Sequence, residues 1–198
     1  GVAGGPVDKS WIILQAYYAQ QTGGSLVDSV EARFAAPPLT NELLGSGELD
    51  AALNFWHWNA RAKAAGMSEL ISVADMLEGL GISDQAPLLT WAFTDETAAE
   101  KEDAMIGFLN ASFDAKDLLL EDDAVWESLR ELMGATDDDA RFEQLKADYR
   151  AGIVASYDPA DTAAAEATFA LLSEYGGADA VGDVPELADG TFWAKFSR

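Results

Sequence analysis

The feature that most constrains the fold is a change of pattern near Asp95. Before it, short apolar runs at 30–35, 49–55, 70–73 and 88–93 alternate with stretches of helical spacing at 9–21, 39–44 and 56–65. Strands that alternate with helices are typical of an α/β layer with a largely parallel sheet. We therefore predict that residues 1–94 form a small α/β unit.

After Asp95 only helical spacing remains, so we predict that residues 95–198 form an α-helical C-terminal half. A long helix is expected around 105–113. A second covers 125–133 with a cap at Asp122 or Asp123, and a third covers 142–149 with a cap at Thr136. The fourth is expected to begin at Asp158 and Pro159 and to stop at the glycine pair 176–177.

The first candidate binding element is the turn near the start of the sequence. Gly4 and Gly5 allow a tight turn before a helix that either Asp8 or Ser10 can cap. Backbone N–H groups and the positive end of a helix dipole meet at such a turn, which favours a carboxylate, sulfonate or phosphate. The same turn brings Lys9 and, one turn into the helix, Trp11 into the predicted ligand-binding set.

A second candidate element is the aromatic turn at 54–58. Asn54, Trp56, His57 and Trp58 lie where a predicted strand ends and a helix begins, the edge at which open α/β sheets bind ligands. Tryptophan offers flat apolar walls and asparagine offers a donor and an acceptor. Of Trp56 and Trp58, we expect one in the core and one in the cleft.

Charge and composition narrow the possible classes of protein. The net charge of −23 would repel a nucleic-acid backbone or an anionic membrane. The sequence contains no cysteine and only one histidine, His57, so it offers no thiol nucleophile and no cysteine-based metal site. No carboxylate pair or phosphate-binding motif stands out. These observations favour a protein that binds a ligand without catalytic residues, cofactor or metal.

The order of several segments resembles the periplasmic substrate-binding proteins of ABC transporters. It is most similar to the nitrate, sulfonate and taurine group and to relatives that bind thiamine-precursor pyrimidines. The segments that carry this resemblance are 1–11, 36–39, 47–51, 54–58, the helix stop at Gly66, 80–82 and 189–193. Within 36–39, Pro37 joins the predicted ligand-binding set.

The resemblance implies a type II periplasmic-binding-protein fold in which residues 1–94 form the second lobe. Residues 95–198 would pack on that lobe and back onto a first lobe, whose N-terminal segment is expected to be lacking here. The implied function is capture of a small polar or anionic solute, of the sulfonate, nitrate-like or pyrimidine class, in an interlobe cleft. The implied partner is the membrane permease of the transporter, and the implied location is the periplasm.

Two other functions remain open at this point. The effector-sensing domain of a bacterial transcription regulator shares this lobed fold and would follow a helix-turn-helix. A thiamine-pyrimidine synthase resembles these binding proteins but would need histidine and metal or cofactor ligands.

The helical half also carries apolar side chains that the resemblance leaves partly uncovered. We therefore expect this chain to form a two-fold homodimer through that half. The side chains concerned are Met105, Ile106, Leu109, Phe113, Phe169 and Leu172.

Overall fold

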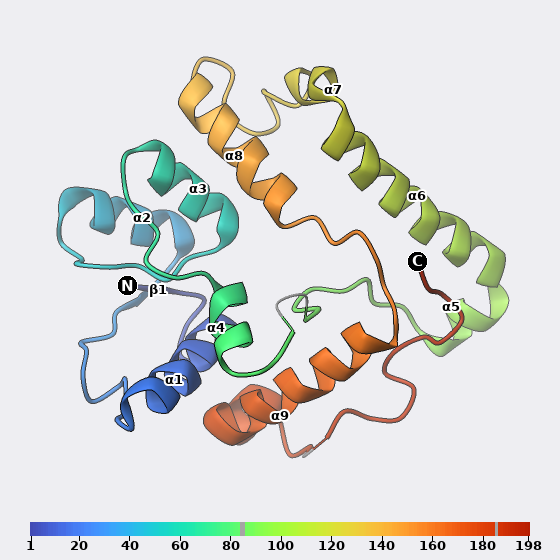
Figure 1. Ribbon diagram of the computed structural model, residues 1–198, viewed down its shortest axis with the longest axis horizontal. Coiled ribbons are helices and arrows are strands. Elements are labelled where there is room, and N and C mark those ends of the chain that lie inside the picture. The colour runs from blue at the N-terminus through green and yellow to red at the C-terminus, as the bar shows by residue number, and fades with distance from the viewer. Residues whose placement is uncertain (84–85, 185) are drawn as a thin grey trace.

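The computed structural model describes residues 1–83, 86–184 and 186–198, and helices account for most of them (Figure 1). The only sheet in these ranges has two strands, β1 (Val2–Ala3) and β2 (Phe34–Ala35), paired in parallel. Val2 also forms an isolated parallel bridge with Leu53 on the other side of β1. The result is a short ladder with β1 in the middle.

The prediction of a type II periplasmic-binding-protein lobe is therefore wrong for the described residues. Two strands of two residues and one bridge are too little sheet to form an α/β layer. The physical reason is the lack of partners, because an apolar run becomes a strand only where another backbone is available to complete its hydrogen bonds.

The runs at 70–73 and 88–93 illustrate this point. Ser72 caps the helix α4 (Val73–Gly79) through a capping box with Asp75, so the first run ends in a helix start. Leu89 and Trp91 are 87% and 61% exposed, and no strand is assigned to 88–93.

Each arm of the ladder leads within a few residues into a helix. The helix α1 (Lys9–Thr22) follows β1, α2 (Pro37–Ser46) follows β2, and α3 (Trp56–Ala64) follows Leu53. The predicted start of α1 is confirmed, and Asp8 is its cap. The predicted alternation of strand and helix is thus limited to three short strand–helix connections around β1.

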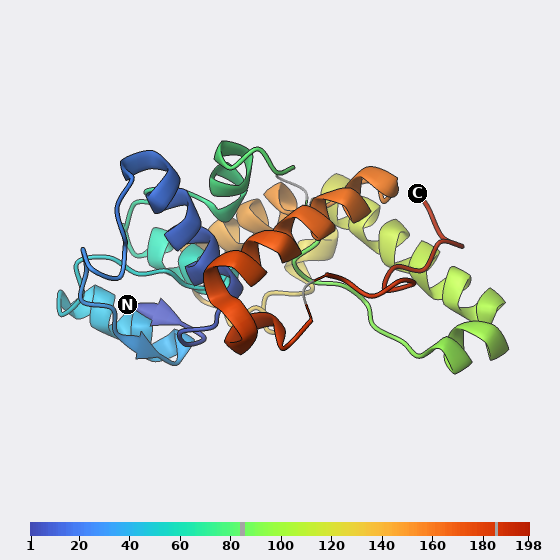
Figure 2. The same cartoon turned by 90° about the horizontal axis from the view of Figure 1, so that it is seen from below.

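The main core brings the two halves of the sequence together. The helix α9 (Pro159–Val181) packs on α1, which also contacts α4 (Figure 2). Ile12 and Ile13 are 1% and 0% exposed and lie in one apolar cluster with Met76, Leu77 and Leu172. α1 is therefore surrounded by apolar side chains from distant parts of the sequence.

α9 begins at Asp158 and Pro159 as predicted, but it does not stop at the glycine pair. Gly177 has φ 59° and ψ −158°, which kinks the helix, and the helix continues to Val181. At Gly176 an added Cβ would lie 2.7 Å from Cδ1 of Ile12, so glycine allows close packing of α9 against α1 there.

The helix α8 (Asp139–Ala151) contacts α3, and a second apolar cluster joins α8 to α7 (Asp123–Glu127) and the end of α6 (Glu102–Glu121). Trp126 and Phe142 are the buried aromatic side chains of this cluster, and Trp126 lies on α7. Asp122 caps α7 as predicted, but the helix expected over 125–133 ends at Glu127. The predicted cap at Thr136 is also wrong, because Asp138 caps α8.

The remaining helices are α5 (Asp95–Glu100) and α6 (Glu102–Glu121), which runs along the outer edge of the molecule (Figures 1 and 2). Phe113 is the only buried side chain among the 20 residues of α6. The ring of Phe196 lies 5.9 Å from it, and Trp91 contacts Phe108 at 4.9 Å. Arg198 forms ion pairs with carboxylates of α6 at 2.8 and 2.7 Å.

Candidate functional site

Three chain segments leave the parallel ladder at one edge, where their carboxyl ends meet. In the ladder, the Ala3 N–H donates to the Leu53 carbonyl at 3.0 Å, and the Val2 N–H donates to the Arg33 carbonyl at 2.8 Å. Because all three arms run in the same direction, the turn at 4–8 and the turn at 54–55 both lie at the carboxyl edge. α1, α2 and α3 therefore all begin near the same place.

At the start of α1, the chain's own carboxylate takes the position that an anionic ligand would need. The side chain of Asp8 accepts the N–H of Ser10 at 2.9 Å and that of Trp11 at 3.3 Å. Gly4 and Gly5 have φ of 92° and 101°, and an added Cβ on Gly4 would lie 2.8 Å from a carboxylate oxygen of Asp8. This turn is closed tightly around its cap.

Two other residues predicted for this turn have structural contacts. Trp11 is 4% exposed and packs edge-on against Phe34 at 6.0 Å, so its ring belongs to the core. The ammonium group of Lys9 donates to the carbonyl of Leu88.

Asn54 joins the starts of α2 and α3. Its amide donates to the Pro37 carbonyl and to Oδ1 of Asn41, both at 2.9 Å, and its Oδ1 accepts the N–H of Phe55 at 2.8 Å. Its backbone carbonyl accepts the amide of Asn59 at 3.1 Å. Both amide hydrogens of Asn54 are thus used within the protein. Pro37 accepts one of them through its backbone carbonyl.

Of the three helix starts at this edge, that of α3 is the one with two consecutive free backbone N–H groups among the described residues. Its N-cap residue, Phe55, makes no side-chain capping bond, and within the described residues the N–H groups of Trp56 and His57 have no hydrogen-bond partner. Trp56 is 46% exposed and Phe55 is 40% exposed. Free N–H groups beside exposed rings offer both an anion-binding end and an apolar wall.

The other tryptophan of this turn is more covered. Trp58 is half-buried, and the guanidinium of Arg61 lies 4.9 Å from its ring centre. Its backbone carbonyl accepts the amide of Asn41 at 2.8 Å. Trp56 and Trp58 therefore differ in exposure, with Trp56 the more accessible of the two.

The imidazole of His57 contacts the rings of both Trp56 and Trp58, and its surroundings favour the neutral form. Partial burial, followed by the positive charge of Arg61, lowers the pKa of His57 below its ordinary value of 6.5. The imidazole centre is 5.6 Å from the ring centre of Trp56 and 6.3 Å from that of Phe55. A neutral imidazole can donate one hydrogen bond and accept another.

Sequence reasoning missed two residues that belong to this surface. Phe55 stands inside the aromatic run, and its position before the helix start could have identified it. Tyr149 comes from α8, and its ring contacts that of Trp56 at 5.7 Å. Its helical spacing with Phe142 and Leu145 predicts only that these residues share one face of a helix, and nothing local indicates which helix that face packs against.

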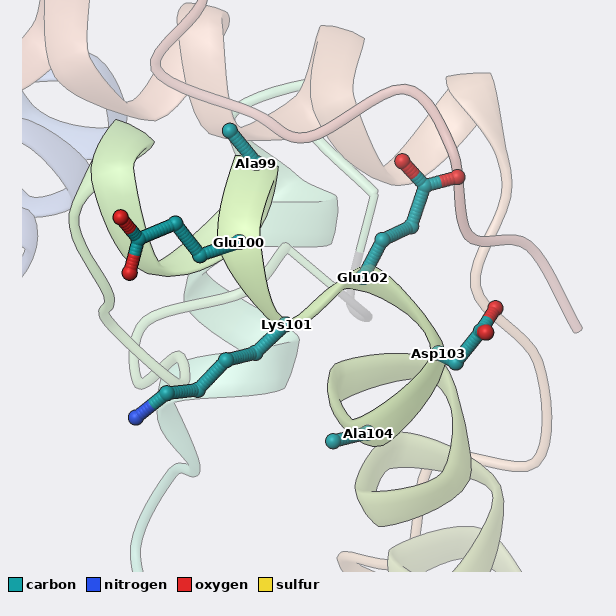
Figure 3. A pocket seen from close by; sticks show the side chains of 6 residues that line it. All are labelled: Ala99, Glu100, Lys101, Glu102, Asp103 and Ala104. Carbon is teal, nitrogen blue, oxygen red and sulfur yellow. The ribbon is translucent and has the colours of Figure 1, made fainter.

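Two hollows among the described residues lie elsewhere and collect no converging groups. One, of about 440 Å³, lies at the connection between α5 and α6. There Glu100 and Lys101 extend to one side, while Glu102 and Asp103 extend to the other (Figure 3). The second, of about 170 Å³, lies between α9 and residues 187–192. Neither contains a residue predicted to bind ligand.

Comparison with known proteins gives no family. No protein-family model matches the sequence, and no curated protein matches it significantly. Among the described residues, no three or more His, Cys, Asp or Glu side chains are grouped as a metal site would require. Within the same ranges, no helix combines the length and apolarity needed to cross a membrane.

Proposed function

We propose that this protein captures a small polar or anionic organic solute at the carboxyl edge of its parallel ladder, as the solute-binding component of an ABC transporter. The solute would be of the sulfonate, nitrate-like or pyrimidine class, and it would be passed on unchanged to the membrane permease. A protein with this role would be located in the periplasm.

One observation carries the proposal, namely the open start of α3 beside exposed aromatic rings. The unpartnered N–H groups of Trp56 and His57 would receive the anionic or polar end of the solute. The ring of Trp56, 46% exposed, would contact a flat or apolar body. The neutral imidazole of His57 would add one hydrogen bond.

The arrangement at the other two helix starts makes α3 the preferred position. Asp8 already occupies the N–H groups of α1, and α2 begins with Pro37 and Pro38, which have no N–H to offer. The order of segments described above, from the glycine turn to the aromatic turn, supports the transporter role.

The test is a thermal-shift and calorimetric screen of the chain against sulfonates, carboxylates, nitrate and pyrimidines. A ligand at 100 times its dissociation constant should stabilise the protein by roughly 2.7 kcal/mol. Trp56→Leu should weaken binding at least tenfold, while the matched change Trp91→Leu, at another exposed tryptophan, should leave the ligand-induced shift unchanged. Conversion of a bound compound to product would contradict the proposal, as would equal effects of the two variants.

A further inference from the structure

We propose that an exposed apolar stripe on α6 binds a second copy of this chain, with the two α6 helices antiparallel across a two-fold axis. This inference is independent of the solute-binding proposal. We call the surface the α6 stripe, and it consists of Ala104, Phe108, Ala111, Ala115 and Leu118.

The spacing of the α6 stripe is that of a helix-pairing seam. Its members follow one another at intervals of four, three, four and three residues, which is the repeat of the two seam positions in a coiled coil. All five are exposed, with Phe108 at 46% and Leu118 at 49%. The side chain that α6 does bury, Phe113, lies outside this seam.

The apolar side chains that the sequence led us to expect partly uncovered are less exposed than those of the α6 stripe. Phe113 and Leu172 are each 8% exposed, and Met105, Ile106, Leu109 and Phe169 are half-buried. The open face of α6 is therefore a different one, turned away from the contacts made by Phe196 and Trp126.

The exposed area of the chain is large enough to contain an unfilled interface. A compact monomer of 21.1 kDa exposes about 9,000 Å², whereas this chain exposes 11852 Å². The difference is larger than the roughly 800 Å² that each partner buries in a standard dimer. Trp91, 61% exposed and in contact with Phe108, extends the surface available at one end of the stripe.

The stripe is complementary to itself when the two helices run in opposite directions. Phe108 of one copy then faces Leu118 of the other, and Ala111 faces Ala115. The small alanines allow the helices to approach closely at the centre, and the larger side chains close the two ends. The dipoles of two antiparallel helices also attract each other.

The charge of the chain determines how this association should respond to salt. None of the five stripe positions is charged, but acidic residues flank them, and each copy carries −23. Salt screens repulsion beyond about 10 Å at 0.1 M and leaves apolar burial almost unchanged. Dimerisation should therefore strengthen as salt is added, whereas docking of a basic partner would weaken.

The first test is sedimentation equilibrium of the chain at low and high salt. We expect a monomer–dimer equilibrium whose dissociation constant falls as salt rises. Ala111→Glu should raise that constant by about tenfold or more, because it places a charge in the seam. Asn110→Glu adds the same charge on the polar face of α6 and should have little effect. A monomer at every salt and high micromolar concentration would overturn the proposal, as would equal effects of the two variants.

The second test uses the absence of cysteine from the sequence. Ala111→Cys and Ala115→Cys are made as separate single variants and oxidised alone and mixed. In an antiparallel pair the mixture should cross-link faster than either variant alone, because position 111 faces position 115. Faster cross-linking of each single variant, or equal rates in all three samples, would overturn the arrangement. Circular dichroism and the melting temperature establish that each variant is folded.

Discussion

α1 and α6 are both rich in apolar residues, yet they differ sharply in how much of them is covered. α1 buries four of its 14 residues and contacts both α4 and α9. α6 buries one of its 20 residues, and its most extensive helix contacts are with the short helices α5 and α7 that adjoin it in sequence. Apolar content alone therefore does not give burial, which depends on how many other elements the helix meets.

The largest expected effect tests this contrast with the same substitution in both helices. Ile13→Ala should lower the free energy of unfolding by roughly 2–5 kcal/mol, because Ile13 is 0% exposed and its loss leaves a cavity. Ile106→Ala, at a half-buried position on α6, should cost about 1 kcal/mol because its neighbours can relax. Urea denaturation measures both, and equal losses would show that α6 is as well packed as α1.

The next effect concerns the way the two helices begin. Asp8 caps α1 by accepting two backbone N–H groups, whereas Lys101 at the start of α6 makes no side-chain capping bond. Asp8→Ala should lower the free energy of unfolding by about 1 kcal/mol. Asp28→Ala removes the same charge from an exposed loop and should have no measurable effect. If the two variants denature alike, the cap does not stabilise α1.

A smaller loss of stability is expected from removing the ion pairs between α6 and Arg198. Arg198→Met removes ion pairs to Asp114 and Asp117 and should lower the denaturation midpoint by less than Asp8→Ala does. The loss should shrink at high salt, because these charges are exposed. Arg33→Met, which breaks an isolated exposed pair with Glu31, serves as the control and should change nothing. A loss that persists in high salt would indicate packing rather than charge.

The smallest effect belongs to His57 at the start of α3. Because its pKa is lowered in the folded state, the unfolded chain takes up a proton first as the pH falls through about 6.5. The contribution of His57 to stability is thus present above that pH and lost below it. His57→Gln should reduce the fall in unfolding free energy between pH 7.5 and about 5.5. A variant whose pH dependence matches that of the parent would contradict this assignment.

Much of the helical framework could be predicted from sequence because its signals are local. The cap at Asp8, the start at Asp158 and Pro159, and the Asp122 cap of α7 each depend on residues within one turn of the helix end. Whether the apolar runs at 70–73 and 88–93 form strands could not be decided from such local signals. Apolar composition favours a strand, but whether one forms depends on a partner backbone elsewhere in the chain.

For the candidate site, too, only the features that depend on neighbouring residues could be predicted from sequence. The sequence identified the aromatic turn at 54–58, since a helix start beside tryptophans is a local pattern. It could not tell that Asp8 fills its own helix start, that Trp11 is core, or that Asn54 bonds to Pro37 and Asn41. Each of these outcomes depends on which groups approach in space.

By itself, then, the sequence determined the positions of most helices and the residues at their ends, because these follow from hydrogen bonds within a few residues of each other. Only the tertiary structure decided how little sheet forms, which helix start stays open and which face of α6 stays uncovered. Those properties depend on contacts between residues far apart in the chain, such as α1 with α9 and α3 with α8, and no local pattern specifies such partners.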